Sequence, residues 1–148
     1  MGRKRSRAGQ YLYVCAACLI ITVLAACAPL KMMADRQESH DHLQRARDLV
    51  AQGDYDGAVR ENQQVLSLSP DASPGDEALF SLGLIYAHYG NPKKDFKRSL
   101  GFFTRVVKEF PGSPLAEEAK IWIGVLGSIE KAKQVDIQIE EKKKELTK

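Results

Sequence analysis

Apolar and polar residues alternate with a helical period over most of the chain beyond residue 35. One stripe of apolar and small residues covers residues 35–52 and ends at Gly53-Asp54, and a second covers residues 58–68 and ends before Pro70. Because positions three and four apart share one face of a helix, each stripe predicts an amphipathic helix. The glycine between them predicts a tight turn, so the two segments are expected to form an antiparallel helical hairpin.

The same pattern recurs in the next forty or so residues. Apolar stripes over residues 77–89 and 96–110 stand on either side of Gly90, and they predict a second hairpin. Asn91-Pro92 is expected to start its second helix, with asparagine as the N-cap and proline in the first helical position.

A third unit opens near Pro114. The offset of 41 residues from Pro70 to Pro111 also separates Gly83 from Gly124, so the register repeats. No glycine or proline follows Ser128 to stop the helix. We therefore expect one long terminal helix, whose charged extension covers residues 131–148.

The extension has apolar residues at three-four spacing. A stripe drawn from Val125 through Ile129, Ala132 and Ile139 meets Asp136 and Lys143, which interrupt it. A self-sufficient coiled coil is therefore not expected from this stripe.

The spacing of small and aromatic residues in these hairpins resembles the tetratricopeptide repeat, a helix-turn-helix family with a period of about 34 residues and small residues where helices cross. The resemblance implies an all-α array of about two and a half repeats over residues 36–130. The second unit has four extra residues between Gly90 and Ser99, which we expect to lengthen its second helix by about one turn. The residues that carry the resemblance are Ala46, Gly53, Tyr55, Ala58, Pro70, Gly83, Tyr86, Gly90, Pro111 and Gly124.

Residues 1–26 have the layout of a secretory signal. Four basic residues and no acid stand among the first seven, and residues 11–26 are almost wholly apolar or small. This apolar run is shorter than the roughly 20 residues that span a bilayer as a helix, and it ends at small residues instead of a basic flank. A cleaved targeting segment is therefore expected in preference to a permanent transmembrane helix.

The end of that segment, Leu24-Ala25-Ala26-Cys27, resembles the lipobox of bacterial lipoproteins. The resemblance implies a diacylglyceryl group on the sulfur of Cys27, cleavage before this residue and acylation of the new amino terminus. Residues 27–35 are then expected to form an extended, lipidated tether. The alternative is an ordinary signal peptide cut after the Ala26-Cys27-Ala28 triplet, which would release a soluble protein.

Cleavage before Cys27 changes the charge and the cysteine content of the chain. It removes four of the 22 basic side chains and none of the 19 acidic ones, and the formal net charge falls from +3 to −1. The basic character therefore belongs to the signal and gives no support to nucleic-acid binding. Cys15 and Cys18 leave with the signal, so no disulfide is expected within the mature chain.

Repeat proteins of the tetratricopeptide family bind partners along the face formed by their first helices. Placed by register, that face predicts an apolar groove suited to a helix or extended segment of a partner protein. The alternative is that the terminal helix covers these side chains. The predicted groove residues are Leu43, Arg47, Val50, Phe80, Leu84, His88, Ile121, Val125 and Ile129.

Candidate chemistry elsewhere is weak. His40 and His42 point about 200° apart on a helix, so one metal ion would not use both imidazoles, and no metal site is expected. His88 has no neighbouring nucleophile in the sequence. No serine-histidine-acid pattern or phosphate-binding glycine loop is present, and we expect neither an enzyme nor a small-molecule substrate or cofactor, apart from the covalent lipid. Lys93, Lys94 and the following Lys97-Arg98 form the densest basic cluster of the expected folded body, residues 36–130.

The junction FPGSPLAEEA at residues 110–119 is similar to junctions in repeat lipoproteins of the bacterial envelope, such as the D component of the outer-membrane β-barrel assembly machine and the Tol-Pal coordinator. This resemblance implies a membrane-anchored scaffold for protein-protein interaction in envelope assembly or secretion, which would bind one or more envelope proteins. A regulatory accessory lipoprotein that presents a signal to a sensor is the alternative. Ala28 stands where aspartate commonly retains lipoproteins in the inner membrane, so the periplasm-facing outer membrane is expected.

Overall fold

The structure is a computed structural model that describes residues 33–147, and every regular element in that range is a helix, as the hydrophobic pattern predicts. Residues 38–147 belong to one compact unit. Its first helix extends through residue 52. The other helices are α2 (Tyr55–Leu68), α3 (Gly75–Ala87), α4 (Phe96–Glu109) and α5 (Leu115–Leu146).

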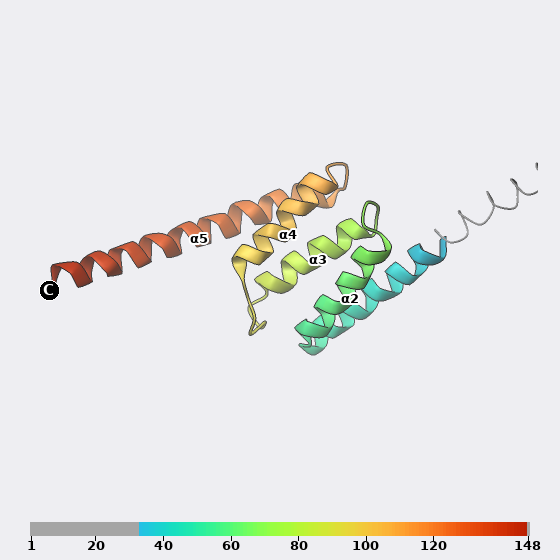
Figure 1. Cartoon of the computed structure of the whole chain (residues 1–148), viewed down its shortest axis with the longest axis horizontal. Helices are drawn as coiled ribbons and strands as arrows, with labels where there is room; N and C mark the ends of the chain where they lie inside the picture. Colours follow the sequence, from blue (N-terminus) through green and yellow to red (C-terminus); the bar gives the residue numbers. More distant parts are fainter. Residues whose placement is uncertain (1–32, 148) are drawn as a thin grey trace, which may run out of the picture. The chain divides into compact units, whose positions relative to one another are not determined.

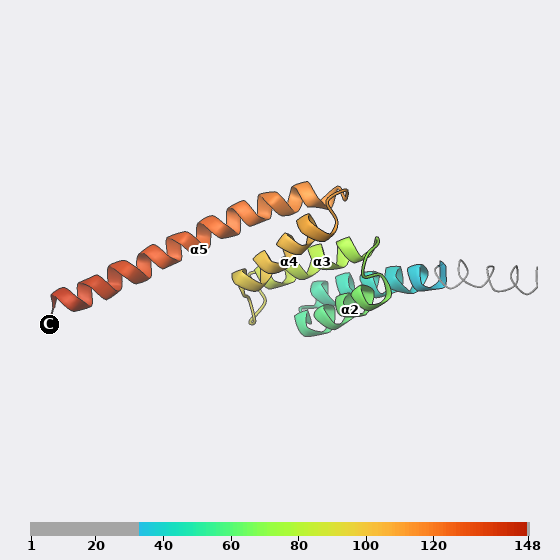
Figure 2. The same cartoon turned by 45° about the horizontal axis from the view of Figure 1, so that its top comes forward.

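The helices pack as successive neighbours. In Figure 1, α3 lies between α2 and α4, and α5 runs along α4; the turned view in Figure 2 shows the same order. The first helix and α2 form one hairpin, and α3 and α4 form the second. α5 takes the position that the first helix of a third hairpin would have, and within the described residues no second helix follows it.

The turn of the first hairpin follows directly from its sequence. Gly53 has a φ of +81°, a left-handed conformation that costs glycine little. Its N–H donates to Val50 O at 3.0 Å and that of Asp54 donates to Leu49 O at 2.9 Å, the pair of bonds of a Schellman motif. The Asp54 carboxylate then accepts from Gly57 N at 2.8 Å and caps α2.

The connection between α3 and α4 differs from the prediction. The four extra residues do not lengthen a helix, because α4 has 14 residues, the same number as α2, and begins only at Phe96. Asn91 is not its N-cap. It is 5% exposed, and its Nδ2 donates to Ile85 O at 2.8 Å, which ties the loop to the end of α3. Asp95 is the cap and accepts from the backbone N–H groups of Lys97 and Arg98.

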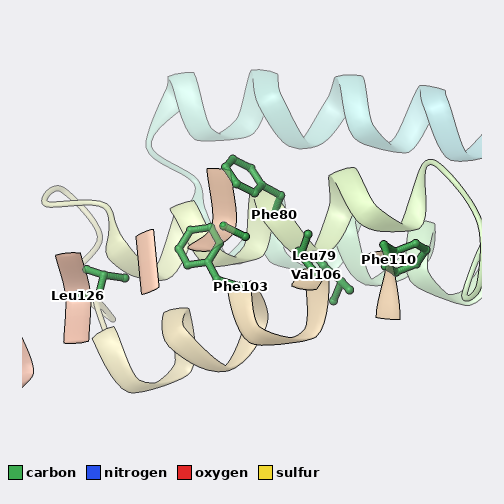
Figure 3. Packing of buried hydrophobic residues seen from close by; sticks show 7 residues of the cluster. Leu79, Phe80, Phe103, Val106, Phe110 and Leu126 are labelled. Carbon is green, nitrogen blue, oxygen red and sulfur yellow. The ribbon is translucent and has the colours of Figure 1, made fainter. Parts of the chain in front are cut away.

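The largest core cluster joins α3, α4 and α5 around Phe103, which is fully buried. Figure 3 shows Phe103 and Phe80 pointing toward each other, and their ring centroids are 5.2 Å apart in an edge-to-face arrangement. On its other side Phe103 stacks on Trp122 of α5 at 5.8 Å. The buried members of the cluster are Leu79, Phe80, Phe103, Val106, Phe110, Ala119 and Leu126.

Small residues lie at close helix crossings, as the tetratricopeptide resemblance implies. Ala46, Ala58, Gly83 and Ser99 are buried, and a Cβ on Gly83 would lie 2.7 Å from the Phe103 ring. Ser99 Oγ also donates to Gly83 O at 2.7 Å across the crossing. The prediction is wrong for Gly124, which is exposed and would have no neighbouring atom within 4 Å of an added Cβ, because no second helix of a third hairpin packs there.

One end of the described chain differs from the predicted structure, and the other end agrees with it. Residues 33–35 are helical, so this part of the predicted extended tether is wrong. At the other end α5 is one continuous helix of 32 residues, and every residue from 131 to 146 is exposed. The long terminal helix and its departure from the core are therefore confirmed.

Candidate functional site

An apolar cavity of about 540 Å³ opens beside α3. Its lining comes from the first helix, from α3 with the residues just after it, and from Trp122 of α5; we call the part contributed by α3 the floor. The side chains that line it are mainly apolar: Arg47, Val50, Ser81, Leu84, Ile85, Ala87, His88, Tyr89 and Trp122. We call it the α3 cavity.

Four of the predicted groove residues line the α3 cavity. Arg47 and Val50 come from the first helix, and Leu84 and His88 come from α3 and its C-cap. Leu84 is 37% exposed, so the floor is open to solvent. The exposed residues 131–146 of α5 are not among the lining residues, and the terminal extension therefore does not cover the cavity.

The other predicted groove residues lie elsewhere. Leu43 and Phe80 are 3% and 7% exposed, so both belong to the core and the prediction for them is wrong. Leu43 packs with α2 and α3, and Phe80 packs on Phe103. The residues of α5, Ile121, Val125 and Ile129, are exposed but do not line the cavity.

Sequence reasoning missed Ser81, Ile85, Ala87, Tyr89 and Trp122 as lining residues. Tyr89 is the last residue of the predicted helix, whereas in the structure it follows α3 and is 89% exposed at the rim of the cavity. Trp122, the only tryptophan of the chain, stands one residue after the predicted Ile121. Neighbouring residues point about 100° apart on a helix, so the predicted face of this helix was wrong by one position.

His88 is held by a local network. Its Nδ1 accepts a hydrogen bond from Gly90 N at 3.1 Å and lies 2.9 Å from Tyr55 Oη. A nitrogen that accepts from a backbone N–H carries no proton, so this arrangement assigns the proton of neutral His88 to Nε2. The ring also stacks on Tyr89 with centroids 4.8 Å apart. Tyr55 and His88 thus fix the rim of the cavity.

Arg47 contributes the only charged side chain among the lining residues of the α3 cavity. Its Nη2 donates to Glu77 Oε2 at 3.0 Å, and the Arg47 side chain remains 60% exposed. The cavity therefore offers an apolar floor with aromatic rings and one guanidinium at its edge. Such a surface suits an apolar side chain of a partner, with a carboxylate or backbone carbonyl close by.

The basic cluster after α3 has structural partners of its own. Lys93 Nζ lies 2.6 Å from Asp56 Oδ2, and the guanidinium of Arg98 lies over the Tyr86 ring at 4.1 Å. Lys94 lies over Phe96 at 5.4 Å. These contacts tie the loop to both hairpins, so the cluster has a part in holding the fold.

The histidines of the first helix form no metal site in the described residues, where no group of three or more potential ligands comes together. His42 Nδ1 instead lies 2.7 Å from Glu61 Oε2, and Arg45 Nε donates to the same oxygen at 3.0 Å. The hydrogen bond with His42, joined by that of Arg45, lowers the pKa of Glu61 from its usual value against the opposing effect of burial.

The lowered pKa of Glu61 predicts a pH dependence of stability. A carboxyl whose pKa is lower in the folded chain stabilises the fold above its unfolded pKa, and this contribution is lost as pH falls through the folded pKa. We expect Glu61→Gln to be less stable than the wild type at neutral pH, with the difference shrinking below about pH 4. Urea unfolding across this range measures it. The exposed Glu118→Gln should show no such convergence, and a constant deficit for Glu61→Gln would contradict the assignment.

Cys27 and residues 1–26, where a signal is expected, lie outside the described residues. Within residues 33–147, no helix combines the length and the apolar character that crossing a membrane requires. Comparisons with protein-family models, with curated proteins and with solved structures find no match, so the function of this chain is inferred from its own residues and geometry.

Proposed function

We propose that this chain is a non-catalytic, lipid-anchored scaffold of the bacterial envelope that binds an apolar segment of a partner protein in the α3 cavity. The observation that carries the proposal is the cavity itself. An opening of about 540 Å³ with a partly exposed leucine on its floor and a tyrosine 89% exposed at its rim has the size and chemistry of a pocket for one large apolar anchor residue.

The surroundings of the cavity favour a protein partner. Tyr89 and Trp122 are residue types enriched in interface hot spots, and Arg47 adds a donor at the edge. The floor lies on α3, the most enclosed helix of the unit, and a rigid helical floor loses little conformational entropy on binding. An amphipathic helix that inserts one or two apolar side chains is the occupant we expect.

Anchoring supports the same proposal. The lipobox at Leu24-Ala25-Ala26-Cys27 and the residue Ala28 favour an acylated protein on the periplasmic face of the outer membrane. Confinement to this layer raises the effective concentration of neighbouring envelope proteins, so a single modest pocket is sufficient for stable capture. The tetratricopeptide-like register and the junction at residues 110–119 are consistent with a role in assembly or secretion.

The experiment is a charge substitution on the cavity floor. Leu84→Glu should weaken binding of the envelope partner at least about tenfold, because a carboxylate replaces an apolar contact in a pocket that binding desolvates. Affinity purification of the full chain from detergent-solubilised membranes, with quantitative mass spectrometry, measures it. The matched control is Ile137→Glu, which places the same charge at another exposed apolar position. Partners that survive Leu84→Glu, with helical circular dichroism intact, would exclude the cavity as the site.

A further inference from the structure

α5 has two apolar faces, and the body of the fold uses only one. Ala116, Ala119 and Leu126 are buried against the rest of the unit. A second set of positions lies roughly opposite them, at about 100° per residue around the helix. All eight members of this set are exposed. We call it the outer seam: Ile121, Val125, Ser128, Ala132, Val135, Ile139, Lys142 and Leu146.

The outer seam follows the spacing of a coiled coil. Its positions are separated alternately by four and three residues without a break from Ile121 to Leu146, and they stay within an arc of about 100° on the helix. Six of the eight are apolar. Ser128 Oγ donates to Gly124 O at 2.9 Å within the helix, so its hydroxyl is already satisfied and can face an apolar surface.

The exposure of the outer seam is large. Five aliphatic side chains on one face of one helix are between 48% and 87% exposed, namely Ile121, Val125, Val135, Ile139 and Leu146. Residues 131–146 extend beyond the body with every residue exposed. An isolated helix of this length is marginally stable in water, so a surface that covers the seam would stabilise it.

The structure also corrects the stripe that the sequence suggested. That stripe included Ile129, Asp136 and Lys143, and its charges argued against a coiled coil. Leu126 of α5 points into the core, so the exposed seam is rotated around the helix relative to the stripe drawn from the sequence. Asp136 and Lys143 therefore lie beside the seam and not within it. Charges at flanking positions are normal in coiled coils and set the choice of partner.

We propose that the outer seam is a dimerisation surface and that its occupant is α5 of a second copy, running antiparallel. With Ile121 opposite Leu146 of the second copy, each layer pairs unlike side chains. Ser128 meets Ile139 and Ala132 meets Val135, so small residues face larger ones. Lys142 meets Val125, where its methylene stem covers the valine and its ammonium group reaches water.

The flanking charges agree with this arrangement. Antiparallel pairing brings Lys131 beside Gln138 and Lys143 beside Trp122, with no like charges opposite each other. A parallel pair would place the two Lys142 residues opposite each other, and its Ser128 and Ala132 layers would be small on small and leave voids. The antiparallel dimer has an isologous interface with twofold symmetry, which closes and does not propagate into fibres.

The first test is co-purification of two differently tagged full-length copies from detergent-solubilised membranes. Wild-type copies should recover each other, and Val135→Glu in both copies should reduce this recovery about tenfold or more, because it places a carboxylate between apolar layers. Ile137→Glu is the matched control, since Ile137 is 42% exposed on the same helix but lies off the seam. Undiminished recovery with Val135→Glu, or an equal loss with Ile137→Glu, overturns the proposal.

The second test is independent of any destabilising charge. A photo-crosslinking amino acid at Ile121 of the full chain, in intact cells, should yield an adduct of two copies in which mass spectrometry finds the segment around Leu146. An adduct that joins the two segments around residue 121 overturns the antiparallel pairing. An adduct with a different protein, or no adduct, overturns the second copy as the occupant.

Discussion

Replacing Phe103 with alanine is expected to remove about 3–5 kcal/mol from the free energy of unfolding. The side chain is fully buried, it makes an edge-to-face contact with Phe80 and a stacked contact with Trp122, and its ring would lie 2.7 Å from a Cβ added at Gly83. Truncation leaves a cavity between three helices, and Gly83, which faces it, has no side chain that could fill the space. Urea unfolding followed by far-UV circular dichroism measures the loss.

Phe102 provides the matched control for Phe103. It is the adjacent phenylalanine on α4, half-buried, and stacks on Tyr86 with ring centroids 5.7 Å apart. Because part of its surface already contacts water, Phe102→Ala should cost clearly less than Phe103→Ala. Equal losses for the two variants, or a loss below about 1 kcal/mol for Phe103→Ala, would contradict the position assigned to Phe103 at the centre of the core.

Replacing Cys27 with serine is expected to abolish lipid attachment. A hydroxyl does not substitute for the thiol that the lipobox resemblance assigns to the diacylglyceryl linkage, so metabolic labelling with radioactive palmitate should fall to background. Two or more acyl chains hold a protein stably at a membrane, whereas none leaves only protein contacts. The matched control is Cys18→Ser, which changes a cysteine within the apolar run of residues 11–26 and should leave the labelling unchanged.

The lipid prediction has a clear contrary result. If wild-type chain carries no label and its mature form begins at a residue after Cys27, the ordinary signal peptide is the correct alternative. The scaffold would then be a soluble protein, and the effective concentration that anchoring provides would be lost.

Local sequence signals predicted local structure well. Gly53-Asp54 specified its turn because the left-handed glycine and the capping carboxylate act on their immediate neighbours. The start of α4 was harder, since both Asn91 and Asp95 are good N-cap residues. A bond to another element decided between them, because Asn91 is buried by its contact with Ile85. Propensity alone contains no information about that contact.

The candidate site shows the same limit. Helical register correctly placed Arg47, Val50, Leu84 and His88 around one opening. It did not predict which residues of the same face are buried in the core and which are exposed. Phe80 is one turn before Leu84, and it is buried in the core, where it packs on Phe103 of α4. Which of the two apolar faces of α5 enters the core was likewise decided by packing, and periodicity gave no preference between them.

The most direct measurement of the central claim is photo-crosslinking from the α3 cavity in intact cells. With the crosslinking amino acid at Leu84 or at Tyr89, we expect a discrete adduct with the same envelope protein, because both positions line the cavity. The control position is Lys108, which is exposed on α4 and does not line the cavity, and it should not give this adduct. Absence of an adduct from both cavity positions, or the same adduct from Lys108, would contradict the cavity as the partner-binding site.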